Sequence, residues 1–165
     1  MPTLTGRTPA EDAAIVPTAD LVGDVEVELT LLGRHAMHSS QHTEDRQLDR
    51  SGYHLLGRLE RTPLSLKQLA EAFRLDQSTV NRQVNALQKA GHVERIADPD
   101  GGTALLIRPT TAGRRALRRD RDVARSQVAR VLGDWSDRDV AALHRLLRKF
   151  NTSIEGLEGT PWPRS

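Results

Sequence analysis

The chain has 165 residues, with 24 lysines and arginines against 22 acidic side chains, and it contains no cysteine. This length fits one domain with a modest core. The lack of cysteine excludes disulfides, thiolate metal sites and cysteine-based redox sensing. No apolar run approaches the roughly 20 residues of a membrane span, and the N-terminus lacks a signal-peptide core. We therefore expect a cytoplasmic protein.

The net charge of +2 hides an uneven distribution along the chain. Residues 1–65 carry 6 basic and 10 acidic side chains, residues 66–119 carry 10 and 5, and residues 120–165 carry 8 and 7. The middle segment is thus the basic one. A basic segment of this kind is the electrostatic footprint expected of a surface that binds nucleic acid.

The N-terminal part predicts a tail followed by two helices. Residues 1–17 hold several Thr and Pro without periodicity, which indicates a flexible tail. A first helix is expected from Ala19 to about Ser39, where apolar residues keep helical spacing, and a second from about Asp49 to Arg61. Pro63 ends the second helix.

The next stretch predicts two short helices joined by a tight turn. Ser65 and Gln68 form a capping-box pattern, so a helix should begin near Leu66. Asp76 is a good N-cap for the following helix, and Gly91 supplies the left-handed residue that ends it. This order is typical of a helix-turn-helix.

The second of these helices has an outer face suited to DNA. No acidic residue follows the Asp76 cap on that face, and its groups can reach base edges and phosphates. An ordinary solvated face is the alternative, although such faces usually include Glu and Asp. The candidate DNA-binding residues are Gln77, Ser78, Thr79, Asn81, Arg82, Asn85 and Lys89.

A β-hairpin is predicted next. The β-prone runs 92–96 and 104–108 flank the turn sequence Asp-Pro-Asp-Gly-Gly at 98–102, which supplies the positive φ of tight hairpins. Such a wing can lie along the DNA backbone or enter a minor groove. Arg95 and Arg108, one on each strand, are the candidate wing contacts.

The C-terminal part predicts two more helices. Pro109-Thr110 starts a long helix with Thr110 as N-cap, Gly133 interrupts it, and Ser136 caps a last helix. Residues 156–165 are expected to fray unless Trp162 folds back. One core cannot cover the apolar faces of the terminal helices, and a second copy of the chain is their simplest partner. A monomeric helical cap is the alternative.

An ordered set of residues across about 50 positions resembles the MarR family of transcriptional regulators. The set is Leu69-Ala70, Asp76-x-Ser78-Thr79-Val80-x-Arg82-x-Val84-x-x-Leu87-x-x-x-Gly91, Asp98-Pro99-Asp100-Gly101 and Pro109-Thr110-x-x-Gly113. The resemblance implies a dimeric winged-helix regulator whose DNA affinity responds to a small ligand, with Ser78, Thr79 and Arg82 on the recognition helix. The chain departs from the family at the wing tip, where Gly101, Gly102 and Thr103 replace the usual arginines.

The predicted fold is therefore mainly α with a small β-wing: a winged helix-turn-helix with N- and C-terminal dimerisation helices. The expected organisation is a flexible tail at 1–17, a dimerisation helix and linker at 18–47, the DNA-binding core at 48–109, dimerisation helices at 110–155 and a flexible tail at 156–165.

Histidines raise a further question about the first helix. His35, His38 and His42 stand at i, i+3 and i+7, a spacing that can ligate zinc, and some relatives of the family are metal sensors. The resemblance otherwise places His35 and His38, together with Tyr53 and His54 of the second helix, near an effector cleft. Core packing and surface exposure are the remaining alternatives.

Enzyme motifs are missing from the sequence. It has no phosphate-binding Gly loop, no GxSxG and no HExxH, so we predict neither an enzyme nor a cofactor. The leading hypothesis is a homodimeric regulator, a repressor, that binds a pseudo-palindromic duplex DNA operator and responds to a small organic effector. The second hypothesis is a winged-helix protein-interaction module without sequence-specific DNA binding.

Overall fold

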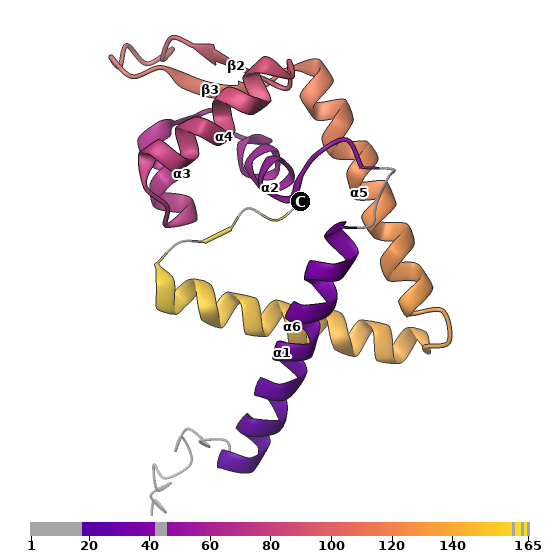
Figure 1. The fold of residues 1–165 in the computed structure, drawn as a ribbon. Coiled ribbons are helices and arrows are strands. Elements are labelled where there is room, and N and C mark those ends of the chain that lie inside the picture. Colours follow the sequence, from indigo (N-terminus) through magenta and orange to yellow (C-terminus); the bar gives the residue numbers. More distant parts are fainter. Residues whose placement is uncertain (1–17, 42–45, 160, 163, 165) are drawn as a thin grey trace, which may run out of the picture. The chain divides into compact units, whose positions relative to one another are not determined.

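The computed structural model of the protein describes residues 18–41, 46–159, 161, 162 and 164, and for residues 36–41 it describes the helix without side-chain surroundings. The chain divides into two units, residues 1–42 and 43–165. The first contains α1 (Ala19–Gln41). The second, shown with α1 in Figure 1, contains α2 (Arg50–Leu59), β1 (Leu64–Ser65), α3 (Leu66–Phe73), α4 (Gln77–Lys89), β2 (Val93–Ile96), β3 (Leu106–Pro109), α5 (Thr111–Val131) and α6 (Asp137–Glu158). The predicted fold class, mainly helical with a small wing, is confirmed.

The predicted helix caps form as the sequence indicated. The Ser65 hydroxyl accepts from the Gln68 amide at 3.2 Å, and the Gln68 side chain accepts from the Ser65 amide at 2.8 Å, which completes the capping box of α3. The side chains of Asp76, Thr110 and Ser136 cap α4, α5 and α6, each by accepting from the amide three residues later. Each cap satisfies an amide that the first turn of a helix leaves without a partner.

The sheet differs from the predicted hairpin in three details. Among the described residues it has three antiparallel strands in the order β1-β3-β2, and β1 was not predicted because two residues cannot show a period-2 pattern. Pro109 ends β3 opposite Val93 rather than starting α5. The predicted second wing strand began at Ala104, but β3 begins only at Leu106 because its partner β2 ends at Ile96.

The hydrophobic core lies between the helices and the sheet of the second unit. Val80 and Val84 of α4 have no exposed surface, so one side of this helix is fixed against the core. The other buried apolar residues come from all the helices of this unit except α6, from the strands and from the segment before α2: Leu48, Leu55, Leu56, Leu59, Leu64, Leu69, Ala70, Leu87, Val93, Ile107, Ala116 and Leu117. Burial of this surface supplies the main stabilisation of the unit.

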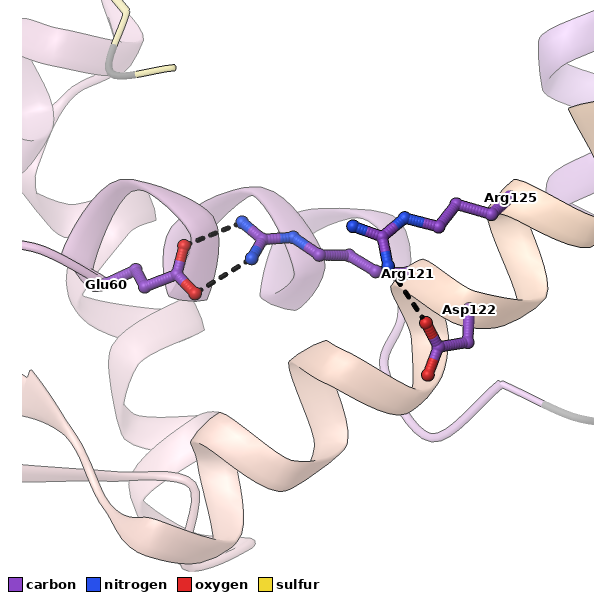
Figure 2. A network of polar contacts seen from close by, with 4 residues as sticks. All are labelled: Glu60, Arg121, Asp122 and Arg125. Carbon is purple, nitrogen blue, oxygen red and sulfur yellow. Dashed lines mark hydrogen bonds and ion pairs between the residues drawn. The ribbon is translucent and has the colours of Figure 1, made fainter. Parts of the chain in front are cut away.

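Polar contacts attach α5 to the segments around α2. The buried carboxylate of Asp120 accepts hydrogen bonds from the amides of Gln47 and Leu48, both at 3.0 Å. At the next position along the same helix, Arg121 forms a two-bond ion pair with Glu60 at the end of α2 (Figure 2). These contacts fix α5 against α2 and the segment that precedes it.

The C-terminal segment differs from the predicted frayed tail. Helix α6 continues through Glu158, beyond the predicted boundary at 155, because Gly159 adopts φ 67° and caps it. Trp162 folds back onto the second unit, which is the predicted alternative to fraying. Its ring lies edge-on to that of Phe73 of α3, with the ring centroids 5.2 Å apart. Among the described residues no helix has the length and apolar character needed to cross a membrane.

Candidate nucleic-acid interface

Helix α4 presents a polar face on the side opposite the core. Val80, Val84 and Leu87 are buried, whereas the predicted contact residues lie on the remaining surface. Thr79 and Asn81 are half-buried, and the others are exposed: Gln77, Ser78, Arg82, Asn85 and Lys89. The structure therefore brings all seven predicted recognition residues onto one accessible helix, beside the β2–β3 hairpin (Figure 1).

Asp76 organises the first turn of this face. Its carboxylate accepts from the hydroxyl of Ser78 and from both the amide and the hydroxyl of Thr79, the last two at 2.8 Å. These hydrogen bonds, that of Ser78 first, hold the pKa of Asp76 far below its ordinary value. Because both hydroxyl protons are directed to Asp76, the two hydroxyl oxygens are left to act as acceptors.

Within the part of the chain that the structure describes, the Arg82 side chain makes one hydrogen bond. Its Nη2 donates to the Thr79 hydroxyl at 3.1 Å, and the residue is exposed. A guanidinium has five N–H donors in a planar fork, so most of this group stays available for a base edge or a phosphate.

Arg95 of β2 lies against α4 instead of pointing away from it. Its Nη2 donates to the side-chain oxygens of Asn81 at 2.9 Å and Asn85 at 2.8 Å, and its Nε donates to Gln88 at 3.2 Å. The two candidate sites, helix and wing, are thus joined by one side chain. Gln88 was not among the predicted residues, although it continues the Asn81–Asn85 stripe at i+7 and its spacing could have indicated it.

Arg108 occupies the neighbouring strand. It pairs with Glu94 across the hairpin, with Nε 2.8 Å from the carboxylate, and both side chains are about half exposed. Such an exposed pair contributes little to stability, so the guanidinium is held only weakly. At the wing tip, Gly101, Gly102 and Thr103 are exposed, and Asp98 accepts from the amide of Asp100 at 3.0 Å to shape the turn.

The end of α4 and the start of α5 are in direct contact. The hydroxyl of Thr110 donates to the carbonyl of Gly91 at 2.6 Å, and the Thr110 amide donates to the carbonyl of His92 at 3.0 Å. At Gly113 a Cβ would stand 2.0 Å from the same His92 carbonyl, so only glycine fits at this distance. The turn that follows α4, at Gly91 and His92, is therefore joined closely to the start of α5.

Two of the predicted effector-cleft residues line a cavity of about 260 Å³ in the second unit. Tyr53 and His54 lie there with centroids 5.8 Å apart, and partial burial of the His54 ring, helped by Arg50, lowers the pKa of His54. The other lining residues were not predicted, since they are scattered along the chain: Gly57, Glu60, Arg61, Leu117, Arg121 and Trp162.

The histidines of α1 belong to the other unit. His35 is exposed, and His38 lies in α1 where the side chain is not described. His42 lies outside the described residues. Within the part of the chain that the structure describes, no three His, Asp or Glu side chains are grouped to hold a metal ion.

Comparisons with known proteins agree with this geometry. A family model described as "MarR family" matches residues 47–102. The uncharacterised HTH-type transcriptional regulator YxaD of Bacillus subtilis (strain 168) is 35% identical over 133 residues, which cover 79% of this chain and 92% of that protein. This match is thus longer than the stretch that the family model covers.

Solved structures share the fold. A MarR family protein from Bacillus stearothermophilus superposes with a TM-score of 0.74 at 20% identity, covering 84% of this chain and 99% of the other. Streptococcus pneumoniae FabT, solved in complex with DNA, superposes with a TM-score of 0.67 at 15% identity, covering 82% and 99%. With the family model and the YxaD match, these likenesses show that the chain belongs to the MarR family of DNA-binding, winged helix-turn-helix transcriptional regulators.

Proposed function

We propose that the protein is a homodimeric repressor that binds a pseudo-palindromic operator in duplex DNA and loses affinity when a small organic effector binds. The observation that carries the DNA-binding part is the outer face of α4, which is accessible, polar and free of acidic residues beyond Asp76. In this proposal α4 lies in the major groove.

The residues of that face divide into two roles. Arg82 and Asn85 are suited to base edges, because a guanidinium matches guanine and an amide can match several bases. Gln77 and Ser78 are suited to phosphates, since the start of α4 offers free backbone amides and a positive dipole end. Lys89, at the other end of α4, is suited to a phosphate through its own positive charge. In the wing, Arg108 is released from Glu94 at little cost and is the proposed backbone contact.

Exposed apolar side chains support the homodimer. Helix α6 buries none of its residues, and Leu157 is 90% exposed. At the end of α5, Val131 is 75% exposed, and on α1 the large apolar residues from Leu21 to Leu32 are at least 39% exposed. Monomers rarely leave so many large apolar residues on their surface, so we propose that a second copy covers them. A two-fold dimer would set two α4 helices about 34 Å apart, one DNA turn.

The cavity beside Tyr53 and His54 is the proposed effector site. Its walls combine aromatic rings with the Glu60–Arg121 ion pair, and the site touches both α2 and α5. An effector that binds better to one spacing of the recognition helices would shift the dimer toward that spacing. Repression would end when the favoured spacing no longer matches the two half-sites.

The deciding experiment is a gel shift with fragments from the gene's own upstream region at two salt concentrations. We expect a specific shift that weakens steeply with salt and falls by about tenfold or more in Arg82→Ala. Arg125→Ala is the charge-matched control, because Arg125 lies on α5 paired with Asp122 (Figure 2). Sedimentation should give twice the chain mass of 18.3 kDa, and a monomer would contradict the dimer.

The composition of the wing tip supports a second candidate function, a protein-interaction module. Gly101, Gly102 and Thr103 offer no cation for a minor groove, which would suit a winged-helix protein-interaction module without sequence-specific DNA binding. Absence of any specific shift would favour that module. Addition of zinc to the same assay tests the metal-responsive alternative that involves His35, His38 and His42.

A further inference from the structure

The contact between Arg95 and α4 determines which way two recognition side chains face. Arg95 stands on β2, yet its guanidinium spans the stripe of Asn81, Asn85 and Gln88 on α4 with three hydrogen bonds of 2.8 to 3.2 Å. Arg95 and Asn81 are half-buried, so this bridge is partly shielded from water.

The chemistry of arginine fixes the amide orientation. A guanidinium only donates hydrogen bonds, so the atom of each asparagine that faces Arg95 must be the oxygen. The NH₂ group of each amide is then at the opposite end of the side chain. Among the described residues neither NH₂ group has a protein acceptor. Asn81 and Asn85 are thereby left with two outward donors each and with oxygens already engaged.

We propose that Arg95 is a positioning residue for base readout: by engaging the oxygens of Asn81 and Asn85, it makes α4 present N–H donors to the major groove. This inference rests on the proposed operator binding. The paired acceptors O6 and N7 of guanine match such a donor pair, as does O4 of thymine. Adenine matches poorly, because its usual bidentate pairing with asparagine needs the side-chain oxygen to accept from N6. The operator positions read by Asn81 and Asn85 are therefore guanine or thymine.

A direct wing contact is the competing role for Arg95. An arginine that binds a phosphate adds affinity for every sequence and contributes about one unit to the salt dependence of binding. A positioning arginine instead changes the choice of base, and its removal leaves the salt dependence unchanged. The two roles thus predict different measurements for the same substitution.

The experiment selects duplexes from a random pool with the full-length wild type, with Arg95→Lys and with Arg95→Ala. Arg95→Lys keeps the cation but loses the rigid planar guanidinium, whose Nη2 and Nε engage Asn81, Asn85 and Gln88 together. Thermal melting of each variant checks the fold. Separate selections with Asn81→Ala and Asn85→Ala identify the base positions that these residues read. At those positions we expect the wild type to choose guanine or thymine and both Arg95 variants to accept adenine, with discrimination falling by about tenfold.

Each result leads to a different conclusion. If the wild type selects adenine at the positions read by Asn81 or Asn85, the inference is overturned, and no result from an Arg95 variant is needed. Unchanged base choice in Arg95→Lys and Arg95→Ala, with uniformly weaker binding and a smaller salt slope, would assign the direct phosphate role instead. Failure of the wild type to enrich any sequence would overturn operator binding itself, which separates that failure from the failure of this inference.

Discussion

The carboxylate of Glu60, at the end of α2, accepts two hydrogen bonds of 2.8 Å from the guanidinium of Arg121 on α5 (Figure 2). Both side chains are partly buried, at 32% and 25% exposed. The hydrogen bonds from Arg121 hold the pKa of Glu60 below its ordinary value, and those to Glu60 raise the pKa of Arg121.

This ion pair makes the free energy of unfolding depend on pH. Because the pKa of Glu60 is lower in the folded chain, the stabilisation is full above the ordinary glutamate value of 4.5 and is lost as the pH falls through the folded value. We expect Glu60→Gln to lower the free energy of unfolding by about 1–2 kcal/mol at pH 7, and by much less near pH 3. Urea unfolding at the two pH values measures this difference.

The exposed pair of Asp122 and Arg125 provides the control for this prediction. Its side chains are 72% and 76% exposed, so Asp122→Asn should change the free energy of unfolding by less than about 0.5 kcal/mol. Equal losses in the two variants would show that Glu60 contributes no more than a surface charge.

Gly113→Ala should destabilise the protein and weaken its binding to DNA. The added methyl group would stand 2.0 Å from the His92 carbonyl, so the junction of α4 and α5 must open. We expect a loss of about 1–3 kcal/mol in thermal or urea unfolding. In the matched variant Gly156→Ala the methyl group meets nothing within 4 Å on α6, and a gain of about 0.5–1 kcal/mol is expected. Similar effects of the two substitutions would contradict the tight junction.

Asp120→Ala should cause one of the larger losses of stability among single polar substitutions. It would leave the amides of Gln47 and Leu48 without their acceptor, at a cost of about 2–4 kcal/mol. Asp120→Asn retains one accepting oxygen and should lose about half as much. Hydrogen exchange at the amides of residues 47 and 48 should quicken in both variants, and unchanged exchange would contradict the anchoring role.

Trp162→Ala tests whether the C-terminal segment is held against α3. Loss of the edge-on contact with Phe73 should lower the free energy of unfolding by about 0.5–1.5 kcal/mol. It should also enlarge the cavity beside Tyr53 and His54, which Trp162 helps to line. Trp135 is 47% exposed and makes no ring contact within the described residues, so Trp135→Ala is the control. Acrylamide quenching of the remaining tryptophan in each variant reports which ring is protected.

Local sequence patterns predicted the helix-turn-helix well because its signals are short-range. Caps such as Ser65 and Asp76 bond to amides three residues away, so the residues that form them are visible together in the sequence. The accessible face of α4 followed from helical periodicity for the same reason.

Long-range partners could not be predicted in this way. Asp120 was one acidic residue in an arginine-rich helix, and nothing nearby in the sequence pointed to amides more than 70 positions earlier. The orientation of Arg95 toward α4 depends on how β2 packs beside that helix, which the hairpin pattern does not specify. The fit of the α1 histidines to an effector or a metal stays a prediction, as does the assignment of parts of the chain to DNA binding and to dimerisation.

The contacts of Gly91 and His92 with the start of α5 join α4 to α5, so the two helices are expected to move together. Helix α5 has 21 residues, or roughly 30 Å of length at about 1.5 Å per residue. A tilt of about 5° at a stiff joint therefore corresponds to a displacement of roughly 3 Å at the far end of such a helix. In the proposed dimer, small rearrangements of the exposed apolar side chains near Val131 would therefore change the position of each recognition helix. Gly113 would contribute by allowing the close approach of α5 to the His92 carbonyl, which keeps the joint between the two helices stiff.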